Sequence, residues 1–262
     1  MKKTLKRWFY SYFPGFSGRF PYFGVKVFFP KNAGIFNVAC RQGIYEKDNV
    51  FLMRHLLKPN SFFFDIGANI GLTSIPMLQF CETCKVVSFE PSPNVLPFLQ
   101  RTAENSVYKD RWVVIGKATG KKIGTSNFFT SNSGNEALGG FRDTKRADTQ
   151  VEIQVPVTTL DEEWNNLQNP QTSVIKIDVE GAELLVLQGG VNLIQQENPA
   201  ILLEWHTVNL KAYDCPPESL LSFCKDINYK IYALPDLISV QNRNELLLHM
   251  RKTENFLLLP IT

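Results

Sequence analysis

The sequence lacks any run of about 18 consecutive apolar residues, so it predicts no membrane-spanning helix. It also lacks a clean secretory signal, because Pro14 and Gly15 interrupt the aromatic stretch RWFYSYFPGF near the start of the chain. There are only five cysteines, an odd number without the spacing of a disulfide framework. We therefore interpret all five as reduced thiols and expect a cytoplasmic protein. Cys81 and Cys84 form a C-x-x-C pair, but no second pair or nearby histidine completes a zinc site.

Acidic side chains are absent until Glu46, whereas residues 1–45 carry eight basic side chains and many aromatic ones. The net charge of the whole chain, +3, is too small to imply a polyanionic partner. Residues 1–20 could contact anionic lipid or a lipid-linked substrate, as a peripheral protein at the inner membrane face does. Alternatively, residues 1–45 form a lid whose aromatic side chains pack on a main domain, which is the commoner use of such residues.

Composition and periodicity predict one large α/β domain over residues 46–262. The chain has 262 residues, 44% of them hydrophobic and 20% charged, which is typical of a globular protein with a sizeable core. From Ser61 onward, strand-like apolar runs alternate with amphipathic stretches, the pattern of a mostly parallel sheet with helices on both faces. We expect its strands, together with the residues that end or directly follow them, at 62–68, 85–91, 111–118, 173–181, 199–206, 230–234 and 255–260.

An insertion at about 119–150 breaks this alternation. It is rich in Gly, Ser, Asn and Thr and has no helical period. Insertions of this length within a compact domain are usually functional loops or lids. A pair of antiparallel strands joined by a loose connection fits the same residues equally well.

Polar residues and glycines follow four of the predicted strands, at the edge where open α/β sheets bind their ligands. They are Asp65, Gly67, Asn69 and Gly71 after the first strand, Glu90 after the second, Asp178 and Glu180 after the fourth, and Glu204 and His206 after the fifth.

The glycine turn FFFDIGANIGLTSIPML does not match the common phosphate-binding motifs. It lacks the G-x-G-x-x-G spacing of dinucleotide sites, and no G-K-[ST] follows it as in a P-loop. Asp65 would also repel a diphosphate, but it suits an adenosyl ligand with a positive amine and sulfonium. Glu90, about 20 residues beyond the turn, is placed to accept hydrogen bonds from a ribose diol, or simply to cap the following helix.

Four sequence blocks, in order, resemble one known family. DIGANIG, VVSFEPSPNVLPFLQRTAEN, VTTLD and VIKIDVEGAELLVLQGG are together similar to the FkbM family of S-adenosylmethionine-dependent methyltransferases, over residues from about Tyr45 to the C-terminus. The resemblance implies a Rossmann-like class I methyltransferase fold with a mostly parallel seven-stranded sheet and an antiparallel last strand. It also implies S-adenosylmethionine as methyl donor, and usually O-methylation of a hydroxyl on a sugar, glycan or glycosylated natural product.

The same resemblance assigns residues to the two ligands. It implies that Asp178, Glu180 and Glu204 face the acceptor. Lys121 stands near a position where many members carry an acid, so contacts to the adenine there depart from the family pattern. The implied cofactor-binding residues are Asp65, Gly67, Ala68, Asn69, Gly71, Glu90, Pro91 and Ser92.

Methyl transfer to an aliphatic hydroxyl requires a positioned acceptor and a group that takes its proton. His206 is the first candidate for this base, because its ordinary pKa suits proton transfer near neutrality. Asp178 and Glu204 are the other candidate catalytic residues, and with Glu180 they could instead ligate Mg²⁺. Three simpler roles remain open: His206 could cap the sheet, Lys176 could pair with Asp178, and Glu183 could occupy the first turn of a helix.

The expected acceptor is a small molecule or glycan. The Asn/Asp-Pro-Pro-aromatic tetrad typical of nucleobase amine methylation is replaced here by DVEG after the fourth strand, so we do not expect nucleic acid as a partner. Base-stacking aromatics interleaved with basic residues occur only near the start of the chain. An RNA methyltransferase and a non-catalytic protein that keeps the cofactor turn as scaffold remain the alternatives.

Overall fold

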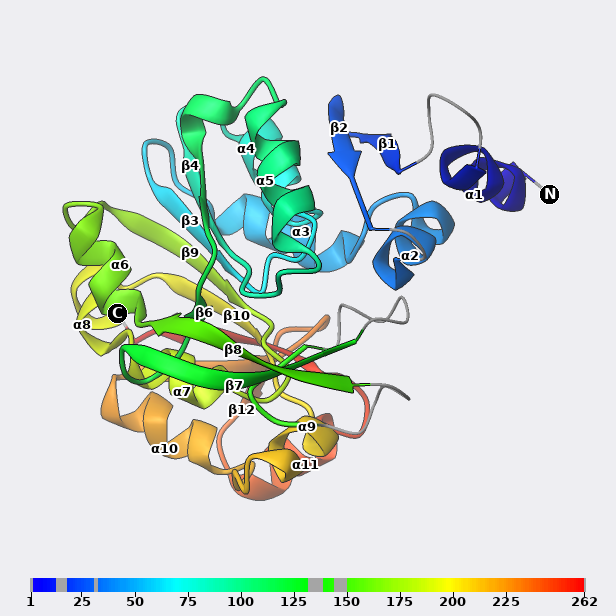
Figure 1. Cartoon of the computed structure of the whole chain (residues 1–262). Helices are drawn as coiled ribbons and strands as arrows, with labels where there is room; N and C mark the ends of the chain where they lie inside the picture. Colours follow the sequence, from blue (N-terminus) through cyan, green and yellow to red (C-terminus); the bar gives the residue numbers. More distant parts are fainter. Residues whose placement is uncertain (1, 13–17, 31–32, 132–138, 144–149, 262) are drawn as a thin grey trace.

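The computed structural model describes residues 2–12, 18–30, 33–131, 139–143 and 150–261. Its main sheet has eight strands in the order β12-β11-β13-β10-β9-β3-β4-β5 (Figure 1). Strands β10, β9, β3, β4 and β5 pair in parallel, whereas β13 runs antiparallel between β10 and β11. The predicted Rossmann-like fold with an antiparallel last strand is confirmed, and the short β12 adds an eighth strand. The strands are β3 (Phe62–Ile66), β4 (Lys85–Phe89), β5 (Trp112–Ile115), β9 (Thr172–Ile177), β10 (Ala200–Glu204), β11 (Tyr229–Ala233), β12 (Ile238–Val240) and β13 (Asn255–Pro260).

Helices cover both faces of this sheet, because its central strands are apolar on both sides (Figure 1). Neighbouring residues on one strand enter opposite cores: Phe63 packs on one side and Phe64 on the other. The first core is completed by α3 (Lys47–Leu56), α4 (Ser74–Phe80) and α5 (Leu96–Glu104). The second is completed by α6 (Leu160–Asn166), α7 (Glu183–Gln188), α8 (Val191–Glu197), α9 (Thr207–Ala212), α10 (Ser219–Asp226) and α11 (Arg243–His249).

The predicted insertion contributes a second sheet. In it β8 (Gln150–Thr158) lies between β6 (Ala118–Thr119) and β7 (Gly124–Ser131), and β7 pairs with β8 antiparallel from Gly124 opposite Val157 onward. The structure thus has the antiparallel pair that was one of the two expectations. Residues 132–138 and 144–149 of the predicted insertion lie outside the described residues.

The segment before Glu46 forms α1 (Lys2–Tyr12), a hairpin of β1 (Arg19–Tyr22) and β2 (Val25–Phe28), and α2 (Gly34–Gln42). Its aromatic side chains join the first core: Phe29 stacks on Phe36 with ring centroids 4.0 Å apart. The backbone N–H of Phe28 donates to Thr102 Oγ1 at 3.0 Å, which attaches the hairpin to α5. The expected packing of these aromatics is therefore present from the hairpin onward.

Cys81 and Cys84, at the end of α4, are joined by a disulfide bond. The interpretation of all five cysteines as reduced thiols is therefore wrong for this pair. Their Cα atoms are 5.4 Å apart, within the range that a disulfide spans, and a turn after a helix allows this although the spacing resembles no framework. Cys40, Cys215 and Cys224 are free. Among the described helices, none is both long and apolar enough to cross a bilayer.

Candidate active site

A cavity lies at the carboxyl ends of the parallel strands, where the sequence placed the ligands. Its floor comes from residues that follow β3, β4, β5, β9 and β10, and its opposite wall comes from the insertion through Phe128 and residues 139–141. Of the predicted cofactor residues, Gly67, Ala68, Asn69, Glu90 and Pro91 line the cavity, whereas Asp65, Gly71 and Ser92 do not.

Packing contacts within the protein constrain two glycines of the turn after β3. Gly67 has a φ of +83°, and a Cβ there would stand 1.9 Å from the backbone carbonyl oxygen of Asp178. Gly71 has a φ of +86°, and its Cβ would meet the Trp112 ring at 2.8 Å. Both positions therefore require glycine for conformation and for space. The amide N–H groups of Gly67 and Ala68 both donate to the carbonyl oxygen of Phe89, which ties the turn to β4.

Glu90 is a buried carboxylate directly after β4, where the sequence predicted an acceptor for the hydrogen bonds of a ribose diol. One oxygen accepts from the backbone N–H of Asn69 at 3.0 Å, and the other from that of Ser92 at 2.8 Å. Each oxygen keeps a second acceptor position, so Glu90 can bind a diol while it holds both loops. Burial raises the pKa of Glu90 to about 7, against the lowering effect of the two N–H donors. The capping alternative is not present in this form, because α5 has Val95 as its N-cap residue without a side-chain cap bond, and the bond from the Ser92 N–H holds the loop before the helix.

Asp65 lies beneath the turn. It is fully buried, and its Oδ2 accepts from Ser74 Oγ at 2.5 Å. Ser74 Oγ contacts Ser88 Oγ at 2.7 Å, and Ser88 Oγ in turn accepts from the indole N–H of Trp112 at 2.8 Å. Burial raises the pKa of Asp65 to about 6, while Lys176, its neighbour across the sheet, lowers it. Asp65 therefore supports the turn through a buried network and does not line the cavity.

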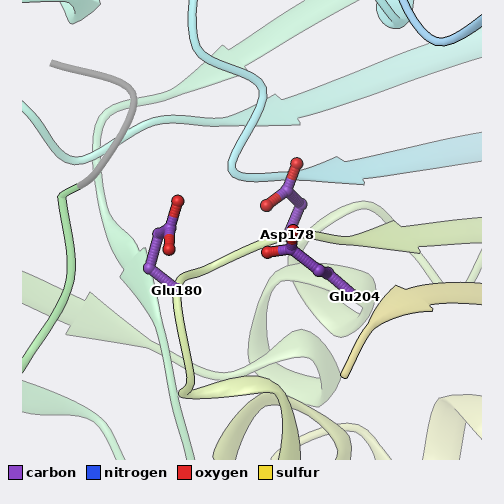
Figure 2. Close-up of side chains that lie close together, drawn as sticks. All are labelled: Asp178, Glu180 and Glu204. Carbon is purple, nitrogen blue, oxygen red and sulfur yellow. The ribbon is translucent and has the colours of Figure 1, made fainter. Parts of the chain in front are cut away.

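Three carboxylates meet on the other side of the cavity (Figure 2). Asp178, Glu180 and Glu204 each offer an oxygen within 4.8 Å of the others. Burial, followed by the charges of Asp178 and Glu180, raises the pKa of Glu204 well above its ordinary value. The Oε2 atom of Glu204 is buried and has no hydrogen-bond partner in the described part of the chain, whereas Glu180 Oε2 accepts from Asn209 Nδ2 at 2.8 Å. This group could hold an acceptor hydroxyl or a divalent cation.

Lys176 is a buried cation beside these acids. Its Nζ donates to Asp178 Oδ2 at 2.8 Å and lies 3.9 Å from Glu46 Oε2. Burial lowers the pKa of Lys176, but the charges of Asp178, Glu46 and Asp65 outweigh it, so the pKa is raised well above the ordinary value. Lys176 therefore stays charged, and its pairing with Asp178 is the one that the sequence suggested.

His206 is not brought into the cavity. The strand β10 ends at Glu204, and His206 is the N-cap residue of α9, with its Nε2 3.1 Å from Glu254 Oε1. Its Nδ1 is buried without a hydrogen-bond partner among the described residues. The alternation that would bring it beside Glu204 ends with the strand. Of the three candidate catalytic residues, Asp178 and Glu204 therefore line the cavity and His206 does not.

Several lining residues were not predicted from the sequence. Ile35, Tyr45 and Glu46 reach the cavity from the segment around α2 and α3. Lys117 lines it after β5 and pairs with Glu163 at 2.8 Å, whereas Lys121 lies outside it. Periodicity gave no signal for these residues, because tertiary packing brings them to the site. The remaining unpredicted wall residues include Thr119, Phe128 and Phe141.

The sequence also matches a known protein family. The sequence model of the "Methyltransferase FkbM domain" matches residues 65–231, well over half of the chain. The chain therefore belongs to the FkbM methyltransferase family. The matched residues begin at the end of β3 and include Glu90, all three clustered carboxylates and Lys176.

One curated relative is the hexuronic acid methyltransferase AglP of Haloferax volcanii, which is 28% identical over 166 residues. The match covers 62% of this chain and 62% of that protein, so the chain spans less than two thirds of the relative's length. A crystal structure of methyltransferase FkbM from Methylobacillus flagellatus aligns with a TM-score of 0.49 and 17% identity, over 86% of this chain and 52% of that one. A precorrin-6y C5,15-methyltransferase from Geobacter metallireducens aligns with a TM-score of 0.44 and 12% identity, over 83% and 89% of the two chains.

Proposed function

We propose that this protein transfers the methyl group of S-adenosylmethionine to a hydroxyl on a sugar, a glycan or a glycosylated natural product. The observation that carries the proposal is one cavity that joins the Glu90 turn to three clustered carboxylates, in a member of this methyltransferase family. The relative that methylates a hexuronic acid supports a sugar as the acceptor. Residues 46–262 would form the methyltransferase domain, with Ile35 and Tyr45 of the preceding segment closing its wall.

The donor half of the cavity fits S-adenosylmethionine. Glu90 would accept hydrogen bonds from the ribose diol, Pro91 would flank the adenine, and Gly67, Ala68 and Asn69 would line the methionine and ribose part. The bound cofactor supplies an activated methyl group. The acidic lining suits its two positive groups, and the turn after β3 lacks the glycine spacing of a diphosphate site.

The acceptor half holds a hydroxyl and removes its proton. Asp178, held by Lys176, would accept that proton, and Glu180 and Glu204 would hydrogen-bond to neighbouring hydroxyls. If a divalent cation binds there, the same three carboxylates are its ligands, and the cation would acidify the hydroxyl. The alternative of a non-catalytic scaffold does not explain why buried acids stay clustered at a desolvation cost.

The proposal is tested by offering the purified protein and labelled donor three separate fractions: glycolipids, nucleotide sugars and RNA. We expect label in a carbohydrate fraction and none in RNA. Glycosidase digestion of the product should release the label on a monosaccharide. Label in RNA alone would replace the proposal with RNA methylation, and donor binding without transfer to any fraction would favour a non-catalytic role.

His206→Ala should change kcat by less than about threefold, because the side chain lies outside the cavity and pairs with Glu254. Steady-state rates at saturating donor would measure this. A general base typically contributes 10² to 10⁴-fold, so a loss in that range would restore His206 as the base. His249→Ala, on α11, is the matched control for loss of an imidazole.

Donor affinity and the stability of the free protein should respond to pH in opposite directions. The carboxyl of Glu90 has its pKa raised to about 7, so in the free protein it contributes stability below its ordinary pKa of 4.5 that is lost as pH rises through 7. Lowering the pH from 8 to 5.5 should therefore raise the thermal midpoint. Over the same range the ionised form that binds the donor disappears, so affinity should fall.

Calorimetry and thermal melts in matched buffers would measure both trends. Glu90→Gln should flatten the affinity profile but only part of the stability profile, because burial also raises the pKa of Glu183 to about 7. Affinity that is constant from pH 5.5 to 8 would contradict an ionised Glu90 at the donor site.

A further inference from the structure

Helix α1 has an apolar stripe that faces away from the protein. Leu5, Trp8 and Tyr12 are exposed by 65%, 52% and 65%, respectively. They stand at positions i, i+3 and i+7, which places them within an arc of roughly 60° on one helical face. The other large apolar side chains that are exposed in the described part of the chain are spread over many elements. In contrast, Leu5, Trp8 and Tyr12 lie together on one face of one helix, and exposing such an apolar patch to water is unfavourable.

The helix is attached through a different side. Tyr10 packs against the first core, and its carbonyl oxygen accepts from the backbone N–H of Gly18 at 3.1 Å. The stripe therefore cannot turn inward unless Tyr10 leaves the core. In Figure 1, α1 lies at the right-hand edge of the molecule beside the hairpin and α2, with the main sheet to their left.

The positive charge of α1 indicates which kind of surface its apolar stripe would contact. Lys6 and Arg7 are exposed on the two flanks of the helix, each roughly 100° around the helix axis from the nearest residue of the stripe. No acidic residue occurs before Glu46, and long basic side chains extend from such flanks toward headgroups. Tryptophan and tyrosine favour the boundary between lipid headgroups and acyl chains, and flanking basic side chains favour anionic headgroups. A nucleic acid would use the basic residues but would not require an apolar stripe at helical spacing.

We propose that α1 docks on the surface of an anionic membrane, with Leu5, Trp8 and Tyr12 at the headgroup boundary and Lys6 and Arg7 at the lipid phosphates. One short helix gives reversible attachment. The inference is independent of methyl transfer, since it rests on α1 alone. Its effect would be to hold the cavity at a surface that carries lipid-linked molecules.

Sedimentation of the full-length protein with vesicles tests this. We expect binding to vesicles of 70% phosphatidylcholine and 30% phosphatidylglycerol, and little binding to phosphatidylcholine alone. The triple variant Leu5→Ser, Trp8→Ser, Tyr12→Ser should lower the partition coefficient by about 10-fold or more. The matched control substitutes Val107, Leu237 and Leu248, which are also exposed apolar residues, by serine and should bind as the wild type does.

Tryptophan fluorescence gives a second readout. The other three tryptophans, Trp112, Trp164 and Trp205, are at most 5% exposed, so brominated lipids should quench only Trp8. Trp8→Phe should abolish the quenching. Thermal melts would show that the triple variant is folded.

Three results would overturn the proposal. The first is equal vesicle binding by a folded triple variant and the wild type. The second is a dimer that the triple variant abolishes, without vesicle binding, since the stripe would then join two copies of the chain. The third is binding to RNA but not to anionic vesicles. None of the three bears on the donor affinity, which reports on the proposed function separately.

Discussion

Replacing Asp178 by asparagine should lower kcat by about 10² to 10⁴-fold, the usual contribution of a positioned proton acceptor. Asparagine keeps the shape of the side chain but cannot take the proton of a hydroxyl. Donor affinity should change by less than about threefold, because Asp178 lies with Glu180 and Glu204 on the proposed acceptor side of the cavity. Single-turnover kinetics and calorimetry would separate the two quantities.

Metal dependence distinguishes the two roles that Asp178 can have. If Asp178 takes the proton directly, a chelator leaves the wild-type rate unchanged, and higher pH partly restores the rate of the asparagine variant. If Asp178 is a ligand, the chelator removes activity and excess Mg²⁺ or Mn²⁺ restores it in the wild type. Asp236→Asn, at an exposed position on the connection before β12, is the matched control. A wild-type rate in Asp178→Asn would exclude both roles.

Replacing Glu90 by alanine should weaken S-adenosylmethionine binding by about 10 to 100-fold, the loss of one or two hydrogen bonds to a charged acceptor. Turnover at saturating donor should fall much less. The variant also loses the bonds from the N–H groups of Asn69 and Ser92, so a lower thermal midpoint is expected as well.

Two controls separate binding from folding. Glu90→Gln keeps an acceptor oxygen and the side-chain volume, so its affinity should lie between the wild type and Glu90→Ala. Glu104→Ala removes an exposed carboxylate from α5 and should leave affinity unchanged. A folded Glu90→Ala protein with unchanged affinity would leave Glu90 only its role of holding the loops at Asn69 and Ser92.

The sequence was most informative where local pattern and topology agree. Short apolar runs that alternate with amphipathic stretches identified the central strands. An apolar run of that length is typical of a strand buried on both faces. The convergence of Glu90, Asp178 and Glu204 also followed, because parallel strands present their carboxyl ends at one edge. Gly67 and Gly71 were recognised as special, but their physical reason, contact with Asp178 and Trp112, required the structure.

Other features depend on contacts that periodicity does not encode. His206 was expected beside Glu204, but β10 ends at Glu204 and the chain turns into α9. Tyr45 and Glu46 reach the cavity because the segment before α3 packs against the end of β9, which no local pattern shows. The disulfide between Cys81 and Cys84 likewise follows from the path of one turn.

The backbone contact between Gly67 and Asp178 couples the two halves of the cavity. The space for a Cβ at Gly67 is filled by the Asp178 carbonyl oxygen, and the Asp178 N–H donates to the Ile66 carbonyl oxygen at 3.0 Å. The loop that would contact the donor is therefore held against the loop that carries Asp178, and we expect the two loops to move together. A ligand that orders either loop lowers the entropic cost of ordering the other, so donor and acceptor should bind with positive cooperativity, each raising the affinity for the other by the same factor.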